Sequence, residues 1–277
     1  MKLGFIGTGS MGSLLIDAFI SSKAVLPEDI WANNRTSYKV EQLKKRHPKL
    51  NAAETNEEAV LNSDVIFLCV KPKEYRNVID HIRNVVLPEQ ILVSITSPVL
   101  VRHLEELLPC KIAKVIPSIT NFAGNGPSLC IFGKRMTKQD RERLEQLLEH
   151  ISCPIEIPEE FTRVSSDITS CGPAFLCYFL QQFIEAAHEE TGIDIENATR
   201  LASEMVLGTG KLLTSGEFTP ETLQERVRVP GGITAEALHL MSDELNGMFN
   251  RLIHTTHKKY QHELSMMESM FYSTRVD

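Results

Sequence analysis

Residues 2–12, KLGFIGTGSMG, join a short apolar run to three glycines, Gly7, Gly9 and Gly12, in the order Gly-x-Gly-x-x-Gly. The apolar run is typical of a buried strand, and SLLIDAFISS (13–22), which follows, is typical of an amphipathic helix. Glycines between a strand and a helix allow a tight turn and let the backbone approach a pyrophosphate at the helix N-terminus. The stretch therefore predicts a dinucleotide site at the first turn of a strand–helix–strand unit.

The end of the expected second strand indicates which dinucleotide binds there. An acidic residue about 20 residues beyond the glycines would bind the ribose hydroxyl of NAD. In its place the sequence has WANNRTSYK (31–39), in which Asn34, Arg35 and Thr36 occupy the position. An acid repels a 2′-phosphate, whereas arginine with amide and hydroxyl donors can bind one. We therefore expect NADPH/NADP as the cofactor.

The rest of the first half alternates strand and helix patterns. Short apolar runs at 64–70, 90–95, 111–116 and 128–133 are typical of buried strands, mostly of a parallel sheet. A helix is expected over 137–150, with a capping box from Thr137 and with Leu144, Leu147 and Leu148 on one face. The alternation predicts a doubly wound α/β domain over residues 1–163. Val70, Lys71 and Pro72 end a central strand, where a nicotinamide-side wall is expected.

The second half has no strand pattern, so residues 164–277 are expected to form an all-α domain. Pro173 stands at the expected start of a helix over 173–190 that is apolar around most of its circumference. Asp194 is expected to cap the next helix, Thr219 and Pro220 to start a short one, and Thr234 to cap a long last one. A helix that is apolar all round is buried or packs in a dimer, so we expect a homo-oligomer.

Composition excludes several classes of protein. The net charge of −7 over 277 residues argues against a nucleic-acid partner. No apolar run reaches the length of about 18 residues that a membrane span needs. The first residues lack a signal-peptide core, and six cysteines without a CxxC pair are typical of reduced thiols. We therefore expect a cytoplasmic protein.

Two segments of the second half place glycine and proline directly before an expected helix: SCGPAF (170–175) and VPGGITAEAL (229–238). The free N–H groups of a helix start bind carboxylates well. Plain helix capping would explain either segment alone, but two of them beside a dinucleotide domain favour a site for a small acid. Cys171 lies in the first segment without a paired base, a resolving cysteine or metal ligands nearby, which disfavours a nucleophile or a metal ligand.

Six segments carry a family resemblance: FIGTGSMG, NRT, FLCVKP, VIPSITN, SCGPAF and VPGGITAEAL. In these segments, and along nearly its whole length, the chain resembles the pyrroline-5-carboxylate reductases. SITSP, VIPSITN and SCGPAF are similar to a divergent branch of that family, the ComER late competence proteins of bacilli. The resemblance implies reduction of 1-pyrroline-5-carboxylate, a small imino acid, to L-proline by NADPH. It also implies a Rossmann domain followed by a helical substrate-binding and dimerisation domain, in dimers that can assemble into rings.

The resemblance and the motifs together assign site residues. Thr234 is expected to hydrogen-bond the ring nitrogen and to help protonate it, as the catalytic group. The expected substrate contacts are Cys171, Gly172, Glu217, Gly231, Gly232, Ile233 and Thr234. The expected cofactor contacts are Gly7, Thr8, Gly9, Ser10, Met11, Gly12, Asn34, Arg35, Thr36, Asn56, Val70, Lys71, Pro72, Ile95, Thr96, Pro117 and Ser118. EAAH (185–188) resembles half of a di-iron motif and HTTH (254–257) holds two histidines three residues apart, but a second such helix is missing, so no metal is expected.

The substrate half departs from the family pattern more than the cofactor half does. Cys171 stands where the family has serine, and Val229 and Ile233 replace two hydroxyl residues of the Pro-Gly-Gly loop. Each lost neutral hydrogen bond costs on the order of 1 kcal/mol. Two alternatives therefore stay open. One is a diverged paralogue that binds NADPH and regulates competence or development; the other is a reductase of another small imino or keto acid.

Overall fold

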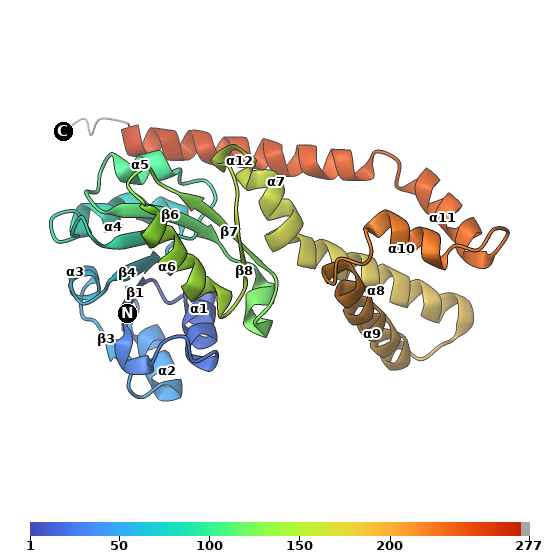
Figure 1. The fold of residues 1–277 in the computed structure, drawn as a ribbon, viewed down its shortest axis with the longest axis horizontal. Helices are drawn as coiled ribbons and strands as arrows, with labels where there is room; N and C mark the ends of the chain where they lie inside the picture. Colours follow the sequence, from blue (N-terminus) through green and yellow to red (C-terminus); the bar gives the residue numbers. More distant parts are fainter. Residues whose placement is uncertain (273–277) are drawn as a thin grey trace. The chain divides into compact units, whose positions relative to one another are not determined.

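The structure, a computed structural model, describes residues 1–272, and short apolar strands form a sheet in the first part of the chain (Figure 1). Its 8-stranded sheet has the order β3-β2-β1-β4-β5-β6-β7-β8, in which only the pairing of β7 with β6 is antiparallel among the described residues. The strands are β1 (Leu3–Ile6), β2 (Ile30–Asn33), β3 (Asn51–Ala52), β4 (Val65–Leu68), β5 (Ile91–Ser94), β6 (Lys111–Ile116), β7 (Pro127–Phe132) and β8 (Cys153–Glu156).

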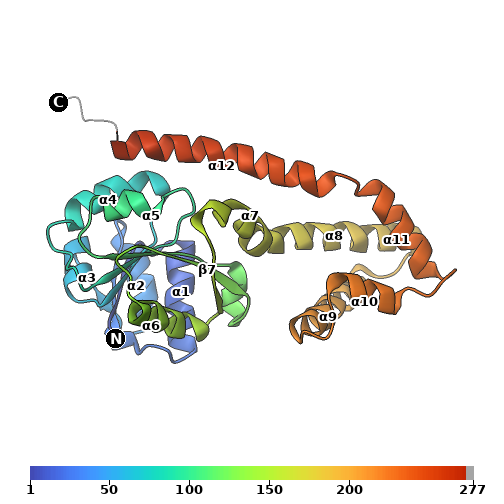
Figure 2. The ribbon, with the colours of Figure 1, turned by 45° about the horizontal axis from the view of Figure 1, so that its top comes forward.

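Helices cover both faces of the sheet, which is why its central strands are apolar on both sides. Phe5 of β1 stacks on Phe67 of β4, with ring centroids 5.0 Å apart, in the apolar cluster on one face. Figure 2 shows α4 and α5 on one side of the sheet and α1 and α6 on the other. The helices of this unit are α1 (Ser10–Ser21), α2 (Ser37–Arg46), α3 (Asn56–Leu61), α4 (Tyr75–Ile82), α5 (Val101–Glu105), α6 (Lys138–Glu149) and α7 (Thr162–Ser166). The expected doubly wound α/β fold is confirmed.

The expected local signals hold in this part of the chain. All five apolar runs form strands, and Thr137 caps α6 by accepting from the Asp140 N–H at 3.2 Å. Two strands carry no apolar pattern and are not predicted by the sequence. β3 is only two residues long, and β8 contains a proline and is mostly exposed.

Four helices and the start of α12 form the second half: α8 (Gly172–Thr191), α9 (Ile195–Thr214), α10 (Pro220–Val227), α11 (Ile233–Glu244) and α12 (Met248–Tyr272). Asp194 caps α9 and Thr219 caps α10, as expected. The expectation of one long last helix is wrong, because α11 ends at Glu244 and Gly247 adopts φ 69° before α12 begins. A positive φ is a glycine conformation that ends a helix.

The expected helix start at Pro173 is also wrong. The chain is already helical before it: α7 continues into a π-helical turn, Asp167–Cys171, and then into α8. Proline inside a helix cannot donate a backbone hydrogen bond, and its ring clashes with the carbonyl four residues earlier. The wider π turn accommodates this defect, so a proline that usually signals a start lies within a continuous helical path.

Packing divides the chain into two compact units. The first holds residues 1–172 together with residues 256–272, and the second holds Pro173–Thr255. The units do not coincide with the sequence-based boundary between 163 and 164, because Met267 and Phe271 of α12 lie in an apolar cluster of the first unit. That domain boundary stays a prediction. Among the described residues, no helix is both long enough and apolar enough to cross a bilayer.

Candidate functional site

A cleft of about 640 Å³ opens beyond the carboxyl ends of β1, β2 and β4. Strand order reverses at β1, and ligands of doubly wound sheets bind beside such a reversal. The cleft brings together expected cofactor residues from four separate segments: Gly7, Gly9, Asn34, Arg35, Thr36, Asn56, Val70 and Lys71. Thr8, Ser10, Met11, Gly12 and Pro72 are neighbours of lining residues in the sequence but do not line the cleft themselves.

The glycine turn requires glycine at its first position. Gly7 has φ 98°, and a Cβ there would lie 2.6 Å from the Cys69 carbonyl oxygen. Gly9 is the N-cap of α1, provides no capping side chain, and has open space around it. The first N–H groups of α1 therefore have no side-chain cap, and an anion can approach them closely.

Asn34 links the glycine turn to the end of β2. Its Oδ1 accepts from the Thr8 N–H at 3.0 Å, and its Nδ2 donates to the Thr36 carbonyl at 3.1 Å. The Thr8 hydroxyl is buried and has no partner in the described part of the chain. A buried polar group of this kind is normally satisfied by water or by a ligand. The turn is therefore held in place and retains hydrogen-bonding capacity.

Arg35 lies at the exposed side of the cleft. Its side chain is 87% exposed, and its Nη1 lies 3.6 Å from Glu74 Oε1. Lys39 and Lys73 line the same cleft and are site candidates that sequence reasoning missed. Their signal was proximity in sequence, because Lys39 follows Arg35 by four residues and Lys73 follows the Val-Lys-Pro motif directly.

Replacing Arg35 with alanine is expected to raise the Kd for NADPH about tenfold, since a charge-assisted hydrogen bond to the 2′-phosphate is lost. The Kd for NADH should stay within about twofold, because NADH has no such phosphate. Fluorescence titration of both cofactors measures the two constants. Arg83→Ala, which removes a cation outside the cleft lining, is the matched control. Equal losses for NADPH and NADH would contradict the assignment of Arg35.

The expected nicotinamide-side residues follow the two neighbouring strands. Ile95 and Thr96 come after β5, and Pro117 and Ser118 come after β6. They are not among the residues that line the cleft. Parallel strands end at the same edge of a sheet, so these residues lie on the carboxyl side of β5 and β6, in line with the glycine turn.

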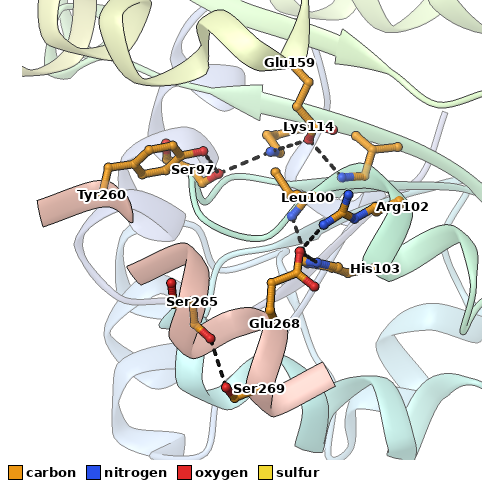
Figure 3. A network of polar contacts seen from close by, with 11 residues as sticks. Ser97, Leu100, Arg102, His103, Lys114, Glu159, Tyr260, Ser265, Glu268 and Ser269 are labelled. Atoms are coloured by element: carbon orange, nitrogen blue, oxygen red, sulfur yellow. Dashed lines mark hydrogen bonds and ion pairs between the residues drawn. The ribbon is translucent and has the colours of Figure 1, made fainter. Parts of the chain in front are cut away.

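A buried lysine holds the segment after β5 (Figure 3). The Lys114 side chain is 0% exposed, and its Nζ lies 2.6 Å from Glu159 Oε1. Lys114 Nζ also donates to the Ser97 carbonyl at 3.2 Å, and so does the Tyr260 hydroxyl of α12, at 3.2 Å. Burial lowers the pKa of the Lys114 ammonium, and the Glu159 carboxylate opposes that shift. The only sequence signal for this group was a lysine inside the apolar strand KIAKVI.

Cys171 ends the π turn, and its Sγ accepts a hydrogen bond from Arg163 Nη2 at 3.2 Å. The helix-start argument for SCGPAF is wrong, because the helical path runs through this segment and leaves no free helix end there. Cys171 and Gly172 keep their substrate roles as predictions from the family pattern alone. The contact with Arg163 joins residues eight apart across a helix irregularity, which a sequence pattern does not reveal.

In the second unit, the Pro-Gly-Gly loop leads directly into α11. Gly231 has φ 71°, and Gly232, rather than Thr234, is the N-cap. Thr234 is the second residue of α11, and the Ile233 side chain beside it is 92% exposed. Gly232 has no capping side chain, so this helix start keeps the expected anion-binding character. Glu217 lies elsewhere, in the connection between α9 and α10.

The described residues contain no group of three or more histidine, cysteine or acidic side chains arranged to hold a metal ion.

Comparison with known proteins finds a matching family model in each half of the chain. Residues 159–263 match the family model "Pyrroline-5-carboxylate reductase dimerisation", and residues 2–98 match "NADP oxidoreductase coenzyme F420-dependent". ComE operon protein 4 of Bacillus subtilis is 42% identical over 98% of this chain and 100% of its own length. A pyrroline-5-carboxylate reductase of Methanosarcina acetivorans is 28% identical over 87% of this chain and 90% of its own length.

The chain belongs to the pyrroline-5-carboxylate reductase family. Solved structures have the same fold. A pyrroline carboxylate reductase of Plasmodium falciparum with NADP bound superposes with a TM-score of 0.80 at 24% identity, over 98% of each chain. A pyrroline-5-carboxylate reductase of Coxiella burnetii gives a TM-score of 0.86 at 22% identity, over 95% of this chain and 98% of the other.

Membership of the pyrroline-5-carboxylate reductase family confirms the expected family and fold. The match of residues 2–98 to an NADP oxidoreductase model confirms the expected class of NADP-dependent oxidoreductase. The glycine turn, the cleft and Arg35 lie within those matched residues. The cleft beside the glycine turn thus belongs to the part of the chain that matches an NADP oxidoreductase model.

Proposed function

We propose that the protein reduces 1-pyrroline-5-carboxylate to L-proline with NADPH. The observation that carries the proposal is the cleft beside the glycine turn, where a backbone suited to a pyrophosphate lies next to Arg35 and Thr36. When bound, NADPH supplies the hydride that adds to the imine carbon, and a proton adds to the imine nitrogen. The C=N double bond thus becomes CH–NH without any other reactant.

The protein's part is to hold the two reactants and to deliver the proton. Gly231 and Gly232 stand at the start of α11, whose N–H groups suit the substrate carboxylate. We assign Thr234 to the ring nitrogen, where its hydroxyl donates a hydrogen bond that is strongest once the nitrogen gains electron density. Cys171 and Gly172 are assigned to the substrate as well, with Ile233 and Glu217 as flanking contacts.

A homo-oligomer, at least a dimer, is part of the proposal. α8 has 20 residues, and none of them is buried. Three of its aromatic side chains, those of Tyr178, Phe179 and Phe183, are exposed, and that of Tyr178 is 67% exposed. An apolar surface of this kind marks an interaction site, and the dimerisation family model covers it. We assign residues 1–163 to cofactor binding and 164–277 to substrate binding and dimerisation. Six free cysteines fit a reducing compartment, so we place the protein in the cytoplasm.

A second candidate rests on the substrate half. Val229 and Ile233 present apolar groups at the Pro-Gly-Gly loop, and the Cys171 thiol is engaged by Arg163. A thiol is also a weaker donor than a hydroxyl. These features favour an NADPH-binding regulator of competence or development, related to ComE operon protein 4, or a reductase of another small imino or keto acid.

Thr234→Ala is expected to lower kcat/KM for pyrroline-5-carboxylate about tenfold, the cost of one hydrogen bond left unmade in the transition state. NADPH oxidation at 340 nm measures the rate, and the Kd for NADPH should not change. Thr199→Ala removes a hydroxyl that bonds only within α9 and is the matched control. Tight NADPH binding without turnover would favour the regulator. Turnover with other imino or keto acids alone would favour a reductase of one of those acids.

A further inference from the structure

The π turn Asp167–Cys171 is bonded to the segment that follows β6. Pro173 displaces the Thr169 carbonyl from its usual helical partner, because the proline four residues later has no N–H. The Ser118 hydroxyl donates to that carbonyl at 2.8 Å. In the other direction, the Ser170 hydroxyl donates to the Pro117 carbonyl at 3.0 Å. The helix irregularity thus becomes a two-point attachment to the expected nicotinamide-side residues.

Arg163 holds the other side of the turn. Its Nη2 donates to Asp167 Oδ1 at 2.9 Å and to Cys171 Sγ at 3.2 Å. Its guanidinium carbon lies 5.9 Å from the ring centre of Tyr260. The side chains of Arg163 and Asp167 are only 16% and 4% exposed. A pair with the same spacing on a helix surface would be mobile, whereas a buried guanidinium with three neighbours has one fixed orientation.

One face of α12 connects this turn with the segment after β5. The Thr256 hydroxyl donates to Asp167 Oδ2 at 2.6 Å. Tyr260, one helical turn further on, donates to the Ser97 carbonyl that Lys114 also contacts (Figure 3). Residues four apart lie on the same side of a helix. The segments after β5 and β6 are therefore tied, through Tyr260, Arg163 and Asp167, to a single set of buried contacts.

We propose that Arg163 and Asp167 are positioning residues for imine reduction. Their buried pair holds the π turn, and with it Cys171 and Gly172, at a fixed place against Pro117 and Ser118. Neither residue is among those that line the cleft beside the glycine turn, and Arg163 bonds to Asp167 and Cys171 within the π turn, so we assign both an action through the turn. The inference rests on the proposed function, because it concerns the placement of the substrate beside the nicotinamide.

The test compares Arg163→Gln, Asp167→Asn and Arg163→Lys. We expect the first two to lower kcat/KM for pyrroline-5-carboxylate at least about tenfold and to weaken L-proline binding to the NADP⁺ complex. Displacement of a group that positions the substrate lowers the reaction rate by a factor of at least this order. The Kd for NADPH should stay within about twofold of the wild-type value. Arg163→Lys should recover part of the loss, because an ammonium can pair with Asp167 but lacks the planar fork.

Glu268→Gln controls for simple loss of stability. It removes the partner of Arg102 and His103 on α12 without touching the π turn. If kcat/KM falls in parallel with the melting temperature in Glu268→Gln and in the Arg163 variants alike, the role is structural and the inference is overturned. Wild-type kinetics in Arg163→Gln would overturn it too. A wild-type protein that neither turns over pyrroline-5-carboxylate nor binds L-proline would refute the proposed function and the inference together. An active wild type whose Arg163 and Asp167 variants have wild-type kinetics would refute only the inference.

Discussion

Gly12→Ala is expected to abolish tight NADPH binding and to lower the melting temperature of the first unit. A Cβ at Gly12 would lie 2.2 Å from the Gly7 carbonyl oxygen and 3.1 Å from Cys69 Cβ. The first contact is with backbone, so either the glycine turn or the start of α1 must move. Such overpacking costs about 3 kcal/mol, or several degrees in melting temperature. The displaced N–H groups should weaken NADPH binding about 100-fold or more.

Gly9→Ala separates the effect on the fold from the effect on the ligand. No atom lies within 4 Å of a Cβ built at Gly9, and its φ of −72° suits alanine. The melting temperature, followed by the fluorescence of Trp31, the single tryptophan, should therefore not change. The Kd for NADPH should still rise about tenfold, because the methyl group occupies the approach of the pyrophosphate. Unchanged NADPH binding in both variants would show that the dinucleotide does not bind at this turn.

The parts of the fold that the sequence predicted correctly are those with local causes. The Gly7–Gly12 turn follows from a strand, three glycines and a helix in direct succession. The Thr137 cap and the leucines of α6 follow from spacing alone. The misplaced helix starts share one cause, because the rule that proline or threonine opens a helix considers only the following residues. At Pro173 the preceding residues were already helical, and at Thr234 the bare glycine before Ile233 was the cap.

The candidate site likewise has one part that follows from local features of the sequence and one part that does not. Gly7, Gly9, Asn34, Arg35 and Asn56 meet in one cleft, because short loops at one edge of a parallel sheet leave them little freedom. The contacts that hold the neighbouring segments join residues distant in the chain. Tyr260 reaches Ser97 across a sequence separation of 163 residues, and Thr256 reaches Asp167 across 89. Such pairings depend on where α12 packs, and no pattern within either segment indicates them.

Glu159→Gln is expected to destabilise the first unit by about 3 kcal/mol at pH 7, although it changes only one atom type. Glu159 Oε1 lies 2.6 Å from Lys114 Nζ and accepts from the Val101 N–H at 2.9 Å. Glutamine can keep the second contact, but it leaves the fully buried ammonium without a counterion. Removal of one partner of a buried pair costs about 3–5 kcal/mol, and the partial exposure of Glu159 favours the lower end. Urea unfolding followed by Trp31 fluorescence measures the free energy of unfolding.

The pH dependence distinguishes this electrostatic cause from a packing defect. Burial holds the folded-state pKa of Lys114 below its ordinary value, and without Glu159 that pKa falls further. Between the folded-state and ordinary pKa values the unfolded chain binds more protons, so the free energy of unfolding rises with pH. In Glu159→Gln the folded-state pKa of Lys114 is lower than in the wild type, so this rise begins at a lower pH. The deficit in the free energy of unfolding relative to the wild type should therefore shrink as the pH is raised from 7 to 9. Glu156→Gln removes an exposed carboxylate that pairs with Arg141, and should cost less than about 1 kcal/mol at every pH. A deficit in Glu159→Gln that stays constant from pH 7 to 9 would contradict the explanation, because a neutral Lys114 no longer needs a counterion.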